Sequence, residues 1–432
     1  SLGAQYTVSA AVVATGTYLN GRIHVGQVSY ESGPDAALPS RPLGKNLQEL
    51  GLRMRRFKTG TPCRVHRRSI DFDAMERQDG DEDIVPFSFG SDPSRMHNQV
   101  SCYITYTNEE THRIIRENLH RSPLFSGQIE GIGPRYCPSI ETKIVRFADK
   151  PRHQLFVEPM GLETEEYYLQ GMSSSLPEDV QLAFLRTIRG LEHVEIMRPA
   201  YAIEYDCVDP TELRASLESK KIAGLFGAGQ FNGSSGYEEA AAQGLLAGLN
   251  AARNALGKEQ LILPRHTSYL GTLVDDLVTK GVMDPYRMMT SRSEYRLTLR
   301  QDNADTRLTP IGREYGLVQD DRWAKYQHTQ NILEAERRRL HDAHLRTADL
   351  QAAMTAAGLA PAAEGGIAEE LLRRPEIHYD LVAGVIGWGE GITPMLAERL
   401  ETEIKYAGYI ARQDRMIREV ARHEKTLIPE DF

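Results

Sequence analysis

Residues 131–143 pack rare, chemistry-bearing residue types densely, in the order Gly-Ile-Gly-Pro-Arg-Tyr-Cys-Pro-Ser-Ile-Glu-Thr-Lys. Glycines let a backbone approach a ligand closely, and Arg135 and Lys143 can pair with phosphates. Cys137 lies between these two cations in the sequence, where a lowered thiol pKa would make it a nucleophile. A small, buried, structural cysteine is the competing interpretation.

A second chemistry-bearing unit spans 222–253. A short apolar strand at 222–226 leads into the glycine-rich loop 227–236, which carries Gln230 and Asn232 and precedes an alanine-rich helix. The N-terminus of a helix stabilises negative charge on a ligand, and a reduced flavin carries such charge on its ring. The unit therefore favours a cofactor site, with a purely structural strand-to-helix turn as the alternative.

Arginines alternate with tyrosines over residues 285–300. Ser291 and Glu294 have the spacing of a capping box, which predicts that a helix begins here. Three arginines would share one face of that helix, namely Arg292, Arg296 and Arg300. Arginines beside aromatic rings can hold phosphates and stack on unpaired bases, although a salt-bridged surface helix would have the same pattern.

The elements that position these groups indicate an α/β protein. The β-branched run at 6–14 ends at Thr15-Gly16 and predicts a buried strand of a parallel sheet that arrives at a ligand-facing turn. Two such strands that meet across an insertion build a large dinucleotide-binding fold. The sequence contains no Gly-x-Gly-x-x-Gly loop. We therefore expect either that dinucleotide chemistry is lacking or that the chain starts downstream of that loop.

The remaining patterns predict an α+β insertion followed by a helical region. The insertion, at about 100–212, has expected strands at 102–107 and 153–157 and expected helices at 112–119 and 176–190, the latter capped by Ser175. Beyond about 265 strand signals fade. Helices are expected there at 322–345, 349–358, 366–374 and 394–425.

Composition limits the function classes. The length of 432 residues predicts two or three domains. The charged fraction of 26% is that of an ordinary globular protein, and the net charge is −9. No membrane-length apolar run or secretory signal is recognisable. The four cysteines are too far apart for a metal-type pair and favour a reduced, intracellular compartment. The negative total still allows local basic patches to bind RNA.

Long strings in this sequence closely resemble the MnmG/GidA family of tRNA uridine 5-carboxymethylaminomethyl modification enzymes. The resemblance covers essentially the whole chain. The strings that carry it are Thr15-Gly-Thr-Tyr-Leu-Asn-Gly21, Lys58-Thr-Gly-Thr-Pro62, Gly133-Pro-Arg-Tyr-Cys-Pro-Ser-Ile-Glu141, Tyr201-Ala-Ile-Glu-Tyr205, Ala228-Gly-Gln-Phe-Asn-Gly233, Gly236-Tyr-Glu-Glu-Ala-Ala-Ala-Gln-Gly244 and Pro285-Tyr-Arg287.

The resemblance implies a glutathione-reductase-like FAD Rossmann domain with an inserted α+β NAD-binding domain and a mostly helical C-terminal domain. The Rossmann domain is expected to be incomplete, because the family's FAD phosphate loop and a short C-terminal tail are expected to lie outside this sequence. The implied domains are the first part of the FAD-binding domain at 1–57, the NAD-binding insertion at 58–212, the second FAD-binding part at 213–264 and a helical tRNA- and partner-binding domain at 265–432.

The activity that the resemblance implies is modification of C5 of wobble uridine 34 in tRNA. FAD, NADH and methylenetetrahydrofolate take part, with glycine or ammonium as the amine, the GTPase MnmE as partner, and a cytoplasmic homodimer as the working form. The residues are consistent with this chemistry, because uracil C5 becomes nucleophilic only after C6 is attacked and a reduced flavin needs a hydride donor.

The resemblance also assigns residues. Ser40 and Gln230 match FAD-contact positions, to which the sequence pattern adds Thr15, Gly16, Gly229 and Asn232. The NAD-binding segment is Gly133, Pro134, Arg135, Tyr136, Cys137, Pro138, Ser139, Ile140, Glu141, Thr142, Lys143, Ile144, Val145, Arg146 and Phe147. The catalytic set is Cys137, proposed to act covalently, with Arg135, Glu141 and Lys143. Arg287 and Arg296 match arginines near the tRNA, Arg292 joins them by pattern, and no metal site is expected. Cys63 stands where the family often has a proline.

Three other functions stay open at this point. The first is a folate- and FAD-dependent methyltransferase of tRNA uridine 54, which shares the flavin domain but is shorter after residue 265. The second is a non-catalytic tRNA-binding scaffold. The third is a plain NADH oxidoreductase.

Overall fold

The computed structural model describes residues 3–136, 138–361 and 364–424. The chain divides into two compact units, the first formed by 1–262 with 273–288 and the second by 263–272 with 289–432. Residues 273–288 thus return to the first unit, although the sequence pattern places the start of the helical domain at 265.

Two strands from distant parts of the sequence pair in the first unit. β1 (Ala11–Val13) runs parallel to β12 (Leu225–Gly227), with Ala11 opposite Leu225 and Val13 opposite Gly227. This confirms the predicted meeting of the two apolar runs. The predicted burial of the first run is wrong, since Val12 is 40% exposed, because β1 has a strand neighbour on one side only among the described residues. The predicted alanine-rich helix is α5 (Tyr237–Ala255), which packs on β12.

The first unit also contains a four-stranded antiparallel sheet with the spatial order β3-β2-β11-β4. Its central strand β11 is buried along nearly all of its length, because strands flank it on both sides. The strands are β2 (Arg22–Val25), β3 (Val28–Glu31), β4 (Met54–Thr61) and β11 (Tyr201–Val208), and helix α1 (Arg41–Glu49) connects β3 to β4.

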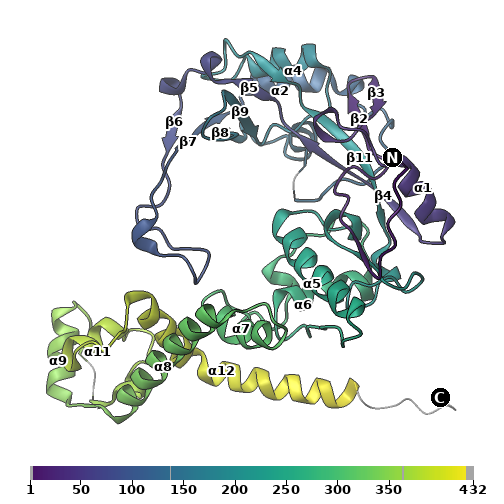
Figure 1. The fold of residues 1–432 in the computed structure, drawn as a ribbon. Coiled ribbons are helices and arrows are strands. Elements are labelled where there is room, and N and C mark those ends of the chain that lie inside the picture. The colour runs from purple at the N-terminus through teal and green to yellow at the C-terminus, as the bar shows by residue number, and fades with distance from the viewer. Residues whose placement is uncertain (1–2, 137, 362–363, 425–432) are drawn as a thin grey trace. The chain divides into compact units, whose positions relative to one another are not determined.

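The insertion folds as a six-stranded antiparallel sheet with helices against one face (Figure 1). Leu155, Val157 and Leu169 are fully buried on that face, against Ile115 and Phe184 of the helices. The strands, in spatial order, are β10 (Ile196–Arg198), β5 (Arg64–His66), β9 (Glu166–Gln170), β8 (Gln154–Pro159), β7 (Cys102–Tyr106) and β6 (Glu76–Gln78); the helices are α2 (Glu109–Glu117), α3 (Ile140–Arg146) and α4 (Glu178–Leu185).

One expected helix of the insertion is shorter than predicted. The pattern at 176–190 predicts a helix capped by Ser175, but α4 ends at Leu185 and its N-cap is Pro177. Ser175 is not available as the cap, because its backbone N–H and its hydroxyl donate to the carboxylate of Glu141.

The second unit is helical, as predicted. Its core contains Leu333, Leu340, Leu350, Val382 and Leu400. The helices are α7 (Ala304–Glu314), α8 (Asp320–Asp342), α9 (Thr347–Ala356), α10 (Ala368–Leu371), α11 (Tyr379–Ile386) and α12 (Pro394–Glu424), with a two-residue ladder of β13 (His344–Leu345) and β14 (Gly366–Ile367). Helix α6 (Tyr269–Asp275) continues into a π-helical turn at Asp276–Lys280. None of the described helices has the length and hydropathy of a membrane-spanning segment.

Candidate functional site

The carboxyl ends of β1 and β12 form the first half of the candidate site. Gly16 has a positive φ of 54°, and a Cβ added there would lie 3.6 Å from Oε1 of Gln230. The two segments that the sequence predicts to meet are therefore in contact. The hydroxyl of Thr15 is buried and has no hydrogen-bond partner among the described residues, so it is a polar atom that a ligand could satisfy.

The glycine-rich loop presents Gln230 and buries Asn232. Asn232 is fully buried, and its amide donates to Oε1 of Gln243 over 2.9 Å. Gln243 in turn donates to the hydroxyl of Ser234 over 2.8 Å. Asn232 thus holds the loop against α5, while Gln230 is half-buried. Gly229, between the two strands' ends and α5, is buried.

Ser40 reaches this region through the turn that follows β1. Its backbone N–H donates to the carbonyl of Tyr18 over 2.8 Å, and Ser40 is the N-cap of α1. The segment that leads to it contains two residues with positive φ, Asp35 at 54° and Ala36 at 61°. Non-glycine residues in that conformation persist only where the surroundings hold them, so the 33–40 segment has a fixed path beside the turn.

A buried carboxylate fixes the loop that begins at residue 130. Glu204, in the middle of β11, accepts hydrogen bonds from the backbone N–H of Glu130 at 2.9 Å and of Gly131 at 2.6 Å. The same carboxylate lies 2.9 Å from Nε2 of His24. An added Cβ at Gly131 would lie 2.8 Å from the carbonyl carbon of Phe57, so a glycine is required for the loop to come this close to β4.

The loop 131–135 forms one wall of a cavity of about 530 Å³. The Lys58 side chain lies in the cavity wall against Gly133, and Nε of Arg135 lies 3.3 Å from the carboxylate of Asp284. Arg146 is exposed and makes no side-chain hydrogen bond or ion pair among the described residues. The predicted NAD-binding residues that line the cavity are Gly133, Pro134, Arg135, Pro138, Ser139, Thr142 and Arg146.

Other residues of the predicted segment do not line this cavity. Glu141 is fully buried and accepts from the hydroxyl of Ser174 at 3.0 Å. Lys143 donates to the carbonyl of Gly171 over 3.0 Å. Both side chains therefore fasten α3 to the chain that follows β9. Ile140 and Ile144 are core residues, while Tyr136, Val145 and Phe147 are exposed. Cys137 lies outside the described residues.

Arg287 is tied to the first turn of α5. Its Nε lies 3.1 Å from Oε1 of Glu239, and the same oxygen accepts the backbone N–H of Met288 at 2.8 Å. Glu239 is only 3% exposed, whereas the Arg287 side chain is 36% exposed. The guanidinium is thus held in one place with part of its surface open to solvent.

The helix predicted to begin at Ser291 is absent, and only a 3₁₀ turn at Thr290–Arg292 forms. The prediction is wrong because Glu294 does not complete a capping box, and its carboxylate instead receives two hydrogen bonds from Arg265, at 2.8 and 2.9 Å. Arg292, Arg296 and Arg300 therefore share no helix face. Arg296 is exposed and has no side-chain partner among the described residues.

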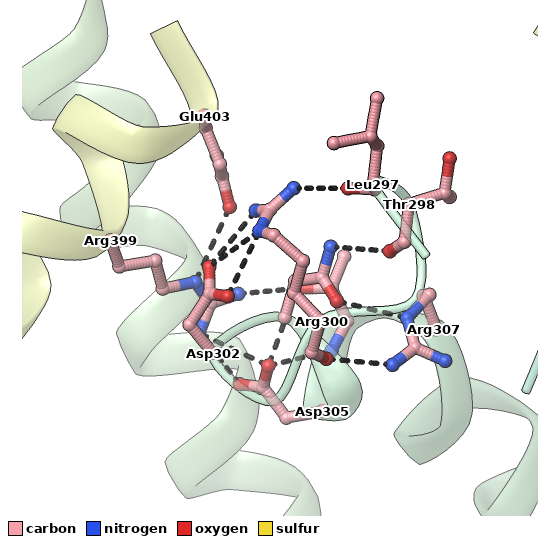
Figure 2. Close-up of polar contacts among 10 residues, drawn as sticks. Leu297, Thr298, Arg300, Asp302, Asp305, Arg307, Arg399 and Glu403 are labelled. Carbon is pink, nitrogen blue, oxygen red and sulfur yellow. Dashed lines mark hydrogen bonds and ion pairs between the residues drawn. The ribbon is translucent and has the colours of Figure 1, made fainter. Parts of the chain in front are cut away.

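A polar cluster in the second unit anchors the segment that carries these arginines (Figure 2). Arg300 points inward and binds Asp302 at 2.9 Å, so it is not part of an exposed basic face. Arg307 donates to the carbonyl of Arg300 at 2.8 Å. Arg399 of α12 is 5% exposed at its side chain and binds Asp305 at 3.0 Å. The sequence analysis missed this cluster, although an arginine between the apolar positions of α12 was a signal for it.

The sequence analysis also missed the Glu204–His24 pair. A single glutamate in a strand that is otherwise apolar or aromatic at its centre, Tyr-Ala-Ile-Glu-Tyr, could have indicated a buried, partnered carboxylate. No group of three or more histidine, cysteine, aspartate or glutamate side chains with a metal-binding arrangement occurs in the part of the chain that the structure describes.

Two family models match this chain. The model described as "Glucose inhibited division protein A" matches residues 1–259, and the model of the "tRNA modifying enzyme MnmG/GidA C-terminal helical domain" matches residues 320–414. Together they cover both compact units in part.

Named relatives are similar along nearly the whole chain. The tRNA uridine 5-carboxymethylaminomethyl modification enzyme MnmG of Caldicellulosiruptor saccharolyticus is 55% identical over 429 residues, which are 99% of this chain and 68% of that protein. The enzyme of the same name from Clostridium botulinum is 52% identical over 431 residues, covering 100% of this chain and 69% of the relative.

Solved structures of a similar protein share the fold. The form I crystal structure of Aquifex aeolicus GidA superposes with a TM-score of 0.86 at 45% identity, covering 100% of this chain and 70% of that one. The form II structure has a TM-score of 0.85 at 43% identity, covering 98% and 67%. These matches confirm the predicted α/β fold with a helical C-terminal domain.

Proposed function

Because this chain belongs to the MnmG/GidA family, we propose that it is an FAD- and NADH-dependent enzyme that modifies C5 of wobble uridine 34 in tRNA. The group added is carboxymethylaminomethyl or aminomethyl, with its carbon from methylenetetrahydrofolate and its amine from glycine or ammonium. The proposed partner is the GTPase MnmE, and the proposed working form is a cytoplasmic homodimer. The relatives' names support the modification of tRNA uridine, and the finer chemistry is our proposal.

The contact between Gly16 and Gln230 is the observation that carries the proposal. It brings together two segments more than 200 residues apart, one carrying the buried hydroxyl of Thr15, which has no hydrogen-bond partner among the described residues, and the other carrying the half-buried Gln230. A hydroxyl and an amide are the groups that would bind the ring oxygens and nitrogens of a flavin. FAD, when bound, would supply the redox chemistry that the one-carbon transfer requires.

The cavity at 131–146 is the proposed NADH site. Its volume of about 530 Å³ is in the range of small-molecule and cofactor pockets. Arg146 and Arg135 would pair with the pyrophosphate, and Gly133 allows the backbone to approach it. Glu141 and Lys143, whose side chains are engaged inside the fold, would position α3 rather than contact the dinucleotide.

Cys137 is the proposed nucleophile. Its thiolate would form a bond to C6 of uracil, and the C5=C6 electron pair would move to C5. C5 would then add to the methylene carbon of the iminium that the one-carbon unit forms with glycine or ammonium, and the C=N electron pair would move to that nitrogen. Loss of the C5 proton would expel the thiolate and restore the double bond. Arg287, Arg292 and Arg296 are proposed to hold the RNA, since a guanidinium can bind phosphate bidentately; Arg296 is exposed, and Arg287 and Arg292 are half-buried.

The test is a flavin and tRNA experiment on the purified full-length protein. It should bind added FAD and turn yellow, and NADH should bleach that colour. The Thr15→Val/Gln230→Ala double variant should bind FAD at least tenfold more weakly, whereas Gln128→Ala, which alters an exposed glutamine, should bind like the parent. A protein that stays colourless with FAD would overturn the proposal and leave the scaffold interpretation.

The position of modification separates the two tRNA activities. With tRNA, the GTPase partner, methylenetetrahydrofolate and glycine or ammonium, nucleoside mass spectrometry should find the new group at uridine 34. A methyl group at uridine 54 would identify the methyltransferase instead. Cys137→Ser should abolish the modification with FAD binding intact, and retained modification would remove the covalent role.

A further inference from the structure

The second unit has its own groove, formed by α12 and the turn that follows α10. Its volume is about 510 Å³, and Arg373, Lys405, Tyr409 and Arg412 are among its lining residues. The turn is fixed to the helix, because Nζ of Lys405 donates to the carbonyl of Pro375 over 3.2 Å. The groove therefore joins two elements that are held together by a described contact.

The groove is lined by cationic side chains, and two of them have no side-chain partner among the described residues. Arg373 and Arg412 are exposed, and neither guanidinium makes a hydrogen bond or ion pair with the described residues. Lys405 is engaged with Glu401 at 2.8 Å and contributes little net charge. No acidic residue lines the groove. Two unpaired guanidinium groups at one groove are suited to an anion, and phosphate is the anion they bind bidentately.

An aromatic ring, that of Tyr409, also lines the groove, between Lys405 and Arg412 in the sequence of α12. Tyr409 is 65% exposed, and the neighbouring Gly408 leaves open space where a side chain would be. The Tyr409 ring is not covered by Tyr406, since the two ring centroids are 6.3 Å apart with planes 57° apart. An exposed ring next to unpaired arginines is the arrangement that stacks an unpaired base and holds its phosphate.

We propose that this groove is a second RNA-contact site, which binds one single-stranded nucleotide with its phosphate between Arg373 and Arg412 and its base on Tyr409. The inference rests on the proposed function, because it takes tRNA as the ligand. RNA fits better than an acidic peptide, since a peptide would use the two cations but would leave the exposed ring without a planar partner. Arg415, three residues after Arg412 in α12, is also exposed and would add positive charge near the groove.

The test measures binding of a labelled RNA hairpin with a single-stranded loop over a series of salt concentrations. For Arg373→Ala/Arg412→Ala, loss of two contacts to single-stranded phosphates should lower the slope of log K against log salt by about 1.4 and weaken binding on the order of tenfold at 0.15 M salt. Arg322→Ala/Lys325→Ala is the matched control, because it removes two exposed, unpartnered cations from α8, and it should stay within twofold of the parent.

The ring is tested separately. Tyr409→Ala should weaken binding about fivefold or more, as expected for loss of one stacked base, while Tyr409→Phe should bind like the parent because it keeps the ring. Thermal melting of each variant shows whether it is folded.

The other outcomes overturn the inference in distinguishable ways. Equal weakening by the two double variants would indicate a general charge effect. Unchanged RNA binding with loss of binding to a polyglutamate peptide would assign the groove to an acidic protein segment. If the parent protein binds neither the hairpin nor intact tRNA, the proposed function itself fails; if the parent binds and the groove variants match it, only this inference fails.

Discussion

Removal of the Glu204 carboxylate should loosen the loop at the cavity. The carboxylate accepts two backbone N–H groups and lies 2.9 Å from His24, all of them buried or half-buried. Hydrogen bonds to charged groups contribute about 1.5–3 kcal/mol each, and truncation leaves the donors unpaired. We therefore expect Glu204→Ala to lower the free energy of unfolding by about 3–5 kcal/mol. Glu204→Gln retains an acceptor oxygen and should cost about 1–2 kcal/mol.

The pH dependence of this effect has a definite sign. Burial alone would raise the pKa of Glu204, but the hydrogen bonds from His24 and Gly131 and the charge of Arg56 outweigh it and leave the pKa below its ordinary value of 4.5. The folded state therefore binds the proton less tightly than the unfolded state. The stabilisation by Glu204 is complete above the unfolded pKa and is lost as the pH falls through the folded pKa. Glu204→Gln should lack this loss.

Urea unfolding and NADH fluorescence titration measure the two consequences. Both Glu204 variants should bind NADH more weakly, Glu204→Ala about tenfold or more, since the cavity wall at 131–135 loses its anchor. The control is Glu195→Ala, which removes an exposed carboxylate paired with Arg68 at 2.7 Å and should unfold at nearly the same urea concentration as the parent, because exposed ion pairs contribute little to stability. If Glu204→Ala unfolds at the same urea concentration as the parent and binds NADH equally well, the positioning argument is refuted.

Three further outcomes follow from single contacts. His112 and His153 have ring centroids 5.3 Å apart. Burial, and after it neighbouring positive charge, lowers the pKa of each imidazole. The melting temperature should therefore stay constant above about pH 6.5 and fall below it, and His153→Gln should show a flatter pH profile. Arg399→Ala should lower the free energy of unfolding by about 3–5 kcal/mol, because it leaves a buried carboxylate unpaired, and faster hydrogen exchange in α12 would show it. Gly133→Ala places a Cβ 2.7 Å from Cε of Lys58; since that side chain can move, stability should change by less than about 1 kcal/mol while NADH affinity falls several-fold.

Local patterns in the sequence were sufficient to predict those helices and strands whose formation depends on nearby residues. The apolar run that ends at Thr15-Gly16 and the glycine-rich loop at Gln230 predicted two strands that meet, and β1 and β12 do pair. The alanine-rich run at 237–253 predicted α5 to within two residues. In each case hydrophobic periodicity and glycine position act within a single element, so one sequence contains the needed information.

Patterns failed where a distant partner decides the outcome. Ser291 and Glu294 have capping-box spacing, yet Arg265, which is 29 residues before Glu294, takes the carboxylate. Valine is typical of buried strands, but Val12 is 40% exposed because its burial depends on strands that neighbour β1, and β1 has only one such neighbour among the described residues. The buried role of Glu204 likewise arises from chain segments about 74 and 180 residues away. Tertiary partners of this kind leave no local period in the sequence.

Buried carboxylates recur as the device that fixes the loops of this site. Each of three accepts a backbone N–H from a distant segment: Glu204 from Gly131, Glu141 from Ser175 and Glu239 from Met288. Burying a carboxylate is costly, and each hydrogen bond that it accepts reduces that cost, so the backbone N–H groups that reach these acids help to hold their loops in place. The loops that carry Arg135 and Arg287 are thereby held by groups that need not touch a ligand. Substitution of these acids should weaken ligand binding in step with local stability, whereas substitution of Arg135 or Arg287 should weaken binding alone.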